Sequence, residues 1–462
     1  MKRIVALMIL AAALAGPAAA GGMKDVTMPP AAERTLDNGL KVFVVETREV
    51  PLVTLRLLVP AGSVFDPAGR EGAANLTAGL LLKGAGGLGA EEISAAIEGV
   101  GGRLEAYAGK EYTIVAGEFL SRNLALGLAH LARAVTAPDF PEDELARERS
   151  IVLARLQQVK ENPGALASRE FTRRLLAGHP YGNPVEGYPG SVGDLARADV
   201  VSFHGTHYVP KGSILAVVGD VDAKKVMTLV GKELGGWTGE APAAKVPDLP
   251  AARVQGRRVI VIDKPDMTQT QIRIGNLAGG MNAPDYFAAE VANTLLGGGF
   301  TSRLMDEIRV NRGLTYGVRS GISRYRGGGY FAVGTFTKHA TARECIDVAL
   351  AEVERIRTEP VGDDELAGTG RYIAGLFPFE IETNGDLARW LTEVEFYGLG
   401  REFVETYRTR VGAVGAGDLR EAAAGNFRSG GNMILVLTNY EATADQLKDL
   451  GELEVIPIGD IE

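Results

Sequence analysis

Residues 71–85 read EGAANLTAGLLLKGA. The run is mostly small and apolar, and it predicts a helix over 72–84. Asn75 and Gly79 lie four residues apart inside it, and in a helix interior each costs up to ~1 kcal/mol relative to Ala. Residues spaced by three or four share one helix face, so Ala78 lies beside them. This face carries no side chain suited to acid–base chemistry.

The segments around this helix alternate between strand-like and helical patterns. A turn at Asp37-Asn38-Gly39 precedes the first strand, and Asp222 is a predicted N-cap for the last helix of this region. In chain order we predict two strands within 34–59, helices over 72–84 and 90–99, strands within 101–120, helices near 122–135 and 141–160, and a strand followed by a helix over 213–234.

The same order then starts again after a segment with three prolines and no apolar periodicity, which predicts a linker over 241–257. The second series has strands over 257–265 and 270–278, a helix over 285–298, a strand over 329–337, helices near 341–357 and 363–377, and a last core strand over 432–439. The sequence therefore predicts two homologous halves, 24–240 and 258–462. The fold class is α+β, with each half a sandwich of an antiparallel-rich sheet and helices packed on one face.

The N-terminus is typical of a secretory signal peptide. Lys2 and Arg3 precede an apolar stretch, and small residues end at Ala20, which predicts a signal over 1–20. The apolar stretch is too short for a stable membrane anchor. Cys345 is the single cysteine, so no intramolecular disulfide forms. We expect an exported protein, periplasmic in a bacterium, with no stable membrane anchor.

Charge and motifs exclude several function classes. The formal net charge is −9 and the pI about 5.4, which argues against non-specific binding of nucleic acid. Neither HEXXH nor HXXEH occurs, and no nucleophile elbow, phosphate loop or dinucleotide-binding glycine pattern is present. His204 and His207 form HxxH, but no carboxylate stands beside them, and helix-end histidines explain the pair better than a metal site.

Five stretches nevertheless resemble one family when taken in order. They are LDNGLKV at 36–42, G-x-A-x₆-L-x-K-G at 72–84, HPYGNPVEG at 179–187, VSFHGTHYVPKGSILAVVGDVD at 201–222, and LGGGFTSRLMDEIRVNRGLTYGV at 296–318. In this order and spacing the chain resembles the M16 zinc metallopeptidases, the pitrilysin, insulinase and mitochondrial-processing-peptidase group. It is most similar to the shorter M16B type, which implies a duplicated M16 fold.

The resemblance explains the helix at 72–84. In active members this helix carries HXXEH, whose histidines bind zinc while the Glu acts as general base, and a later Glu is the third ligand. Carried over, these four positions are Asn75, Ala78, Gly79 and Arg155. Asn is a poor zinc ligand, Ala and Gly have no donor, and Arg repels a cation. We therefore expect no zinc in this chain.

The second half keeps a different part of the family pattern. The resemblance implies that Arg309 and Tyr316, seven apart in IRVNRGLTY, hold the substrate backbone and the developing oxyanion. Taken alone, the pair also fits a surface Arg and a core Tyr. The adjacent loop Gly297-Gly298-Gly299-Phe300 fits a flexible wall of a peptide cavity, a helix C-cap, or both.

A degenerate zinc half joined to an intact Arg/Tyr half implies the zinc-less subunit of a heterodimer. The partner would be an HXXEH-bearing M16 subunit that holds the zinc, and the substrate would be an unfolded or extended peptide. Two alternatives stay open: a non-enzymatic scaffold of the M16 fold, and a self-sufficient peptidase with an atypical metal site.

Overall fold

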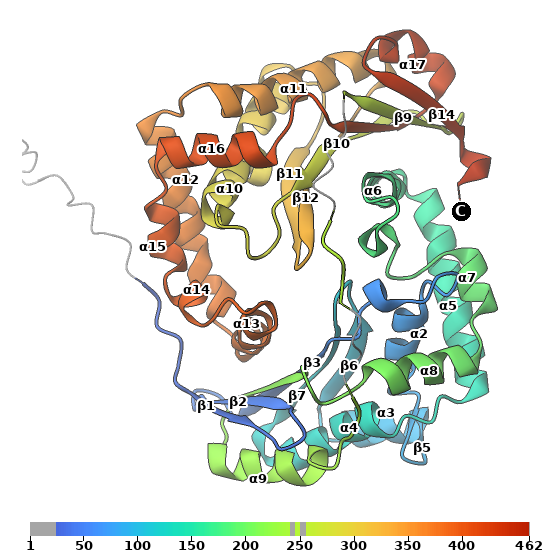
Figure 1. The fold of residues 1–462 in the computed structure, drawn as a ribbon, viewed down its shortest axis with the longest axis vertical. Coiled ribbons are helices and arrows are strands. Elements are labelled where there is room, and N and C mark those ends of the chain that lie inside the picture. Colours follow the sequence, from blue (N-terminus) through green and yellow to red (C-terminus); the bar gives the residue numbers. More distant parts are fainter. Residues whose placement is uncertain (1–24, 241–244, 250–255, 462) are drawn as a thin grey trace, which may run out of the picture.

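The computed structural model describes residues 25–240, 245–249 and 256–461. It forms two halves, with the sheet of the first in the lower part of Figure 1 and the sheet of the second in the upper part. The predicted signal peptide, 1–20, lies outside the described residues, and so does part of the predicted linker over 241–257.

The first half is built on a six-stranded sheet with the order β1-β2-β8-β3-β7-β6. Neighbouring strands are antiparallel except for β2 and β8. The strands are β1 (Ala31–Thr35), β2 (Lys41–Glu46), β3 (Leu52–Val59), β6 (Arg103–Ala108), β7 (Thr113–Leu120) and β8 (Ile214–Gly219). A separate short pair, β4 (Gly84–Ala85) and β5 (Leu88–Gly89), lies outside this sheet.

The second half repeats this topology in five of its six strands, but its last strand is parallel to its neighbour, whereas β1 is antiparallel to β2. Its sheet has the order β11-β12-β10-β13-β9-β14, so β9, β13, β10, β12 and β11 correspond to β2, β8, β3, β7 and β6. As in the first half, the pair β9 and β13 is parallel. The strands are β9 (Arg258–Asp263), β10 (Thr270–Ala278), β11 (Val318–Tyr325), β12 (Gly328–Thr337), β13 (Met433–Thr438) and β14 (Glu452–Pro457). The predicted duplication is confirmed, while β11 and β14 were absent from the prediction.

The predicted helices all form, and further helices lie between them. The side chain of Asp222 caps its helix as predicted, because it accepts a hydrogen bond from the Lys225 amide at 2.9 Å. In the first half the helices are α2 (Ala73–Leu80), α3 (Ala90–Glu98), α4 (Leu124–Thr136), α5 (Glu142–Glu161), α6 (Pro163–Leu175), α7 (Pro189–Asp194), α8 (Arg197–His207) and α9 (Ala223–Leu234). In the second they are α10 (Tyr286–Asn293), α11 (Ala342–Thr358), α12 (Asp363–Leu376), α13 (Asn384–Tyr397), α14 (Glu402–Glu405), α15 (Tyr407–Gly412), α16 (Ala416–Asn426) and α17 (Tyr440–Leu447).

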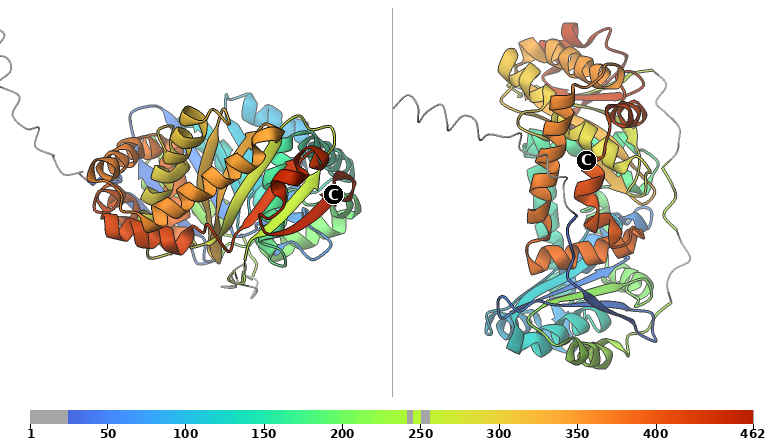
Figure 2. Two further views of the ribbon diagram at one scale, coloured as in Figure 1. Left: turned by 90° about the horizontal axis from the view of Figure 1, so that it is seen from above. Right: turned by 90° about the vertical axis from the view of Figure 1, so that its left-hand side faces the viewer.

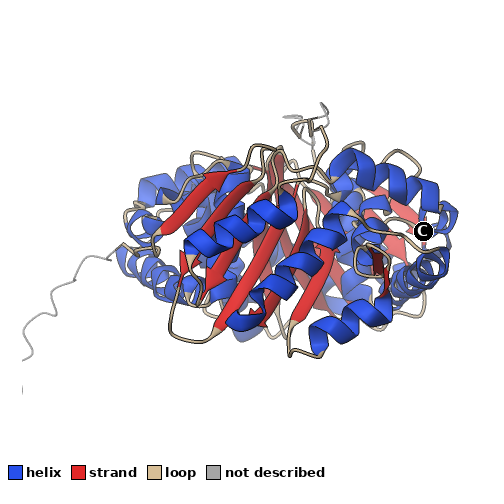
Figure 3. Cartoon of the chain, turned by 90° about the horizontal axis from the view of Figure 1, so that it is seen from below, coloured by secondary structure: helices blue, strands red, loops and turns tan. Residues whose placement is uncertain are grey.

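Each sheet is covered on its second face by a helix from the other half. Helix α6 packs on β10 and β13 of the second sheet, and α13 packs on β3 and β8 of the first. The turned views in Figure 2 and the cartoon in Figure 3 show the strands between layers of helices. The M16-like α/β architecture is confirmed, but the prediction that helices pack on one face of each sheet is wrong, because the exchange places α6 and α13 on the second faces.

The apolar pattern of the strands explains the exchange. In β8, ILAVVG, all six residues are buried, with Leu215 and Val217 in the core beneath the first half's own helices. Ala216 and Val218 belong to the core that includes Leu391 of α13. A strand buried on both faces reads as a continuous apolar run rather than as an alternation.

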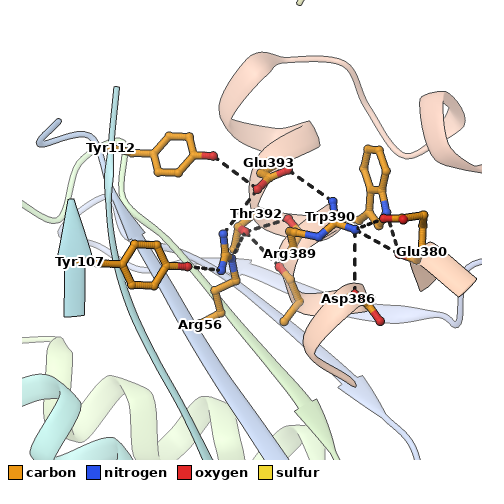
Figure 4. Close-up of polar contacts among 10 residues, drawn as sticks. Arg56, Tyr107, Tyr112, Glu380, Asp386, Arg389, Trp390, Thr392 and Glu393 are labelled. Carbon is orange, nitrogen blue, oxygen red and sulfur yellow. Dashed lines mark hydrogen bonds and ion pairs between the residues drawn. The ribbon is translucent and has the colours of Figure 1, made fainter. Parts of the chain in front are cut away.

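Polar contacts also join α13 to the first sheet (Figure 4). Arg56 of β3 donates a hydrogen bond to the Thr392 hydroxyl at 3.1 Å and pairs with Glu393 at 3.4 Å. The Tyr112 hydroxyl donates to the same carboxylate at 3.3 Å. Burial raises the pKa of Glu393, and the nearby guanidinium groups of Arg389 and Arg56 oppose that rise. These contacts fix the position of α13 on the sheet.

A buried carboxylate ties the halves together at a second point. Glu111 accepts hydrogen bonds from the hydroxyls of Tyr181, at 2.6 Å, and Tyr397, at 2.9 Å. It also accepts from the backbone amide of Arg326, between β11 and β12, at 3.1 and 3.2 Å. One side chain of the first half therefore holds the end of α13 and a hairpin of the second half.

Among the described helices, none is both long and apolar enough to cross a membrane.

Candidate functional site

The first half places the three substituted motif positions on α2. Ala78 is fully buried, whereas Asn75 and Gly79 are half-buried on the adjoining part of the helix. A Cβ added at Gly79 would lie 3.0 Å from Oε1 of Glu148 on α5. The site that the resemblance indicates therefore exists as a surface between α2 and α5, with a carboxylate against it.

Arg155, the position carried over for the third ligand, is exposed on α5. The α5 side chain that lies against Gly79 is Glu148, seven residues earlier, which the sequence reasoning missed. A spacing of seven is two helical turns, so both residues lie on one face of α5. The sequence did contain a signal for Glu148. A carboxylate two helical turns before the substituted position Arg155 points from α5 toward the same neighbouring helix, α2.

The donors on this surface do not fit a catalytic zinc. The substituted face offers the Asn75 amide, and Glu148 adds one carboxylate, whereas a catalytic site needs three good protein ligands. Across the described parts of the chain, no group of three or more His, Cys, Asp or Glu side chains is arranged to hold a metal ion. His204 and His207 lie in the last turn of α8, and burial lowers the pKa of each.

Asp66 organises the start of α2. Its two carboxylate oxygens accept hydrogen bonds from the amides of Gly72 and Ala74, each at 2.8 Å, and so satisfy the helix N-terminus. Burial raises the pKa of Asp66 to about 7, and these two hydrogen bonds oppose the rise. Burial also lowers the pKa of nearby Lys110 to about 8. The sequence reasoning identified neither residue, because their burial depends on the tertiary fold.

In the second half the glycine loop follows an irregular helix. Helix α10 continues as a π-helical segment, η4 (Thr294–Gly298), and a second one, η5 (Met305–Asn311), carries Arg309. Such segments frequently mark functional sites. A Cβ at Gly297 would lie 2.7 Å from the Ser320 amide of β11, so this position needs glycine for close packing.

The loop and Tyr316 line one cavity of about 690 Å³. Gly298, Gly299 and Phe300 form one side, and Tyr316 is 84% exposed, so it is not a core tyrosine. The Arg309 guanidinium lies over the Phe300 ring, 4.7 Å from its centroid. Phe300 and Tyr316 therefore line one cavity, and Arg309 lies at its edge through the contact with the Phe300 ring, while Gly297 is buried behind the loop.

The cavity also contains two arginines that the sequence reasoning did not identify. Arg273 comes from β10 and Arg319 from the start of β11, and Ser168 of α6 closes one side. Their signal was weak: Arg273 lies in a predicted strand, where single arginines are common on sheet surfaces, and Arg319 lies in a segment for which no strand was predicted. No lining residue comes from α2 or α5. The degenerate surface between α2 and α5 is therefore not part of the cavity that Tyr316 lines.

Two family models match the chain, one after the other. Residues 41–188 match the family model for insulinase (peptidase family M16), and residues 194–369 match the model for the peptidase M16 inactive domain. An uncharacterized zinc protease of Mycobacterium leprae is 31% identical over 299 residues, which cover 65% of this chain and 67% of that protein. Subunit 1 of the human mitochondrial cytochrome b-c1 complex is 27% identical over 264 residues, 57% of this chain and 54% of that protein.

A solved structure supports the same assignment. The peptidase M16 inactive domain from Pseudomonas fluorescens superimposes with a TM-score of 0.82 at 28% identity, covering 88% of this chain and 98% of that chain. The first matched model lies within the first half, and the second reaches from the end of the first half to α12 of the second. The chain belongs to the insulinase family of peptidases, family M16.

Proposed function

We propose that this chain is the zinc-less subunit of a heterodimeric M16B peptidase. It supplies Arg309, Tyr316 and one wall of the peptide chamber, and the partner is an M16 subunit that carries HXXEH. The partner holds the zinc and the general base. Within this proposal the chain is exported to the periplasm, and the substrates are unfolded or extended peptides.

The observation that carries the proposal is the contrast between the halves. Gly79 lies against Glu148 with no ligand set for zinc, while Tyr316 lies open in a cavity beside the paired Arg309 and Phe300. An exposed tyrosine next to a cationic group has no evident structural role, whereas both groups suit the binding of a peptide.

The chemistry of this chain's residues is hydrogen-bond donation. The Tyr316 hydroxyl and the Arg309 guanidinium can donate to a peptide carbonyl or to the oxyanion that develops from it. The ring of Phe300 limits the positions that the guanidinium adopts, since a cation over an aromatic ring is held by the ring's quadrupole. This chain thus positions the peptide, and the partner provides the metal chemistry.

The decisive experiment measures peptidase activity and zinc content of this chain alone and mixed with an HXXEH-bearing M16 protein from the same genome. We expect the lone chain to be zinc-free and inactive, and the mixture to be active. In the mixture, Tyr316→Phe should lower activity about 10²- to 10³-fold, the loss typical of one oxyanion donor. Arg309→Ala should also lower activity strongly.

Arg312→Ala is the matched control, since Arg312 lies three residues from Arg309 but pairs with Glu344 at 3.4 Å, whereas Arg309 lies over the Phe300 ring of the cavity. This variant should retain the activity of the mixture. Stoichiometric zinc and peptide cleavage by the lone chain would instead establish the self-sufficient peptidase with an atypical metal site.

A scaffold role is the second candidate, because the chain is similar to a subunit of the cytochrome b-c1 complex. A scaffold has no need of the Tyr316 hydroxyl. If the mixture forms a stable complex but stays inactive, and Tyr316→Phe changes nothing measurable, the scaffold role takes precedence.

A further inference from the structure

We propose that the cavity beside Tyr316 binds a carboxylate group of the peptide. This inference rests on the proposed function, because it takes the cavity to bind a peptide. It adds which peptides the cavity selects, namely those that carry a carboxylate. The shared chemistry is a carboxylate, carried either by an Asp or Glu side chain or by the peptide's C-terminus.

The first argument is the charge of the lining. Arg273 and Arg319 line the cavity, and none of its lining residues is Asp or Glu. The whole sequence has 58 acidic and 49 basic residues, so two arginines without a carboxylate in the lining give the cavity a positive charge on a chain that is acidic overall. A cavity lined by one sign of charge concentrates ligands of the opposite sign.

The second argument is that Arg273 is held without a counterion. Its guanidinium donates to the Ser168 hydroxyl at 3.0 Å and to the backbone oxygens of Gly164 and Ile272, each at 2.8 Å. All of these acceptors are neutral. Burial lowers the pKa of Arg273, which reflects the cost of keeping this charge away from water. A bound carboxylate would offset that cost.

The third argument is that the neighbouring arginines are available. For the described residues, neither Arg319 nor Arg309 has an ion pair, and the contact of Arg309 is with the Phe300 ring. Two acidic side chains of α12, Asp364 and Glu365, line an adjoining, smaller cavity that shares Gly299 and Tyr372 with this one, and Glu365 is paired with Arg303 at 2.7 Å. Arg319 is exposed, so it can turn toward a ligand without losing a structural contact.

The geometry favours a peptide over a free ion. Tyr316, which donates to a peptide backbone in the proposed function, lines the same cavity as Arg319, three residues further along the chain. A peptide held at Tyr316 therefore brings a nearby carboxylate to the guanidinium groups, where charge-assisted hydrogen bonds form.

The test is binding of fluorescent peptides to the purified full-length chain without its partner. The peptides are identical Ala/Ser-rich sequences with blocked termini, and they differ by a central Glu, Gln or Lys. A fourth peptide has the central Gln and a free C-terminal carboxylate. We expect the Glu peptide to bind at least about tenfold more tightly than the Gln peptide, as for hydrogen bonds between charged groups.

Arg319→Gln should remove most of that difference, and raising the salt concentration should reduce it. Arg420→Gln is the matched control, because Arg420 is exposed on α16, away from the cavity. It should leave the difference unchanged. If the free C-terminus binds tightly and the central Glu does not, the carboxylate comes from the peptide end.

Equal binding of all four peptides, no binding of any peptide, or an equal effect of Arg420→Gln would each overturn the proposal. The outcome is independent of the proposed function, since no partner or zinc is present. Charge-independent binding together with an active mixture would refute the carboxylate site alone. Arg319-dependent binding together with an inactive mixture would refute the peptidase role alone.

Discussion

Single residues decide which half can carry chemistry. Asn75 and Gly79 can be recognised from the sequence, because the loss of a ligand is a property of the residue type. The hydrogen-bond donors of Arg309 and Tyr316 can likewise be recognised from the residue types. Asp66 is different: its sequence context is ordinary, and its perturbed pKa exists because α2 and the surrounding chain bury it.

Asp66→Asn tests this burial. Because folding raises the pKa of Asp66 from 3.8 to about 7, the protonated carboxyl is the form that the fold favours. The stabilising contribution of the protonated Asp66 carboxyl is complete below about pH 4 and is lost as the pH rises through about 7. The amide of the variant cannot ionise, so the melting temperature of the wild type relative to the variant should fall between about pH 4 and about pH 7 and level off above that. A difference that is constant over this range would contradict the assignment.

At the scale of elements, α2 and α10 hold equivalent places in the duplicated topology but differ in regularity. Helix α2 is a short α-helix whose face accommodates glycine at position 79. Helix α10 passes into the π-helical segment η4 and then the glycine loop. The resemblance to family motifs located both segments, but the π-helical geometry follows from packing against β11, which sequence periodicity does not reveal.

Gly79→Ala should stabilise the chain. Gly79 has helical geometry, so Ala gains up to ~1 kcal/mol of helix propensity. The new Cβ would lie 3.0 Å from the end of the Glu148 side chain, which can shift by a few tenths of an ångström. The midpoint of urea unfolding should therefore rise.

Gly187→Ala is the contrasting variant. Gly187 has a φ of +78°, and a Cβ there would collide with the backbone oxygen of Glu71. The midpoint of its urea unfolding should fall, because Ala is strained in the left-handed backbone conformation and the main-chain oxygen of Glu71 cannot move without distorting the backbone. If Gly79→Ala destabilises as much as Gly187→Ala, the Glu148 side chain is held more rigidly than the contact indicates.

At the scale of the whole molecule, the two halves complete each other. Helix α13 covers β3 and β8, α6 covers β10 and β13, and Glu111 joins both halves to the end of α13. The halves are repeats in topology, yet each sheet depends on the other half for one of its apolar faces.

A fragment of residues 25–240 should therefore not fold cooperatively by itself. Without α13, the apolar side chains of Phe43, Ala216 and Val218 are uncovered, and exposed apolar area costs about 25 cal/mol per Å². We expect the fragment to bind a hydrophobic dye and to lack a sharp thermal transition. Co-expression with residues 256–461 should restore the transition, whereas a sharp transition of the fragment alone would show that α13 is dispensable.

Glu111→Gln tests the other connection between the halves. Gln keeps the size of the side chain but replaces one acceptor oxygen by an NH₂ group, which leaves a buried donor facing a tyrosine hydroxyl or the Arg326 amide. The free energy of unfolding should fall by about 1–3 kcal/mol. Glu118→Gln, on the exposed part of β7, is the control and should have little effect.

The sequence by itself determined the duplicated α/β organisation, the order of most elements, the family, and the residue types at Asn75, Ala78, Gly79, Arg309 and Tyr316. These follow from local periodicity and from the chemistry of individual side chains. Tertiary structure alone decided the exchange of α6 and α13, the contact of Glu148 with Gly79, the burial of Asp66 and Glu111, and the gathering of Arg273 and Arg319 beside Tyr316. Each of these joins residues far apart in the chain, and the free energy of such contacts depends on burial that no local pattern encodes.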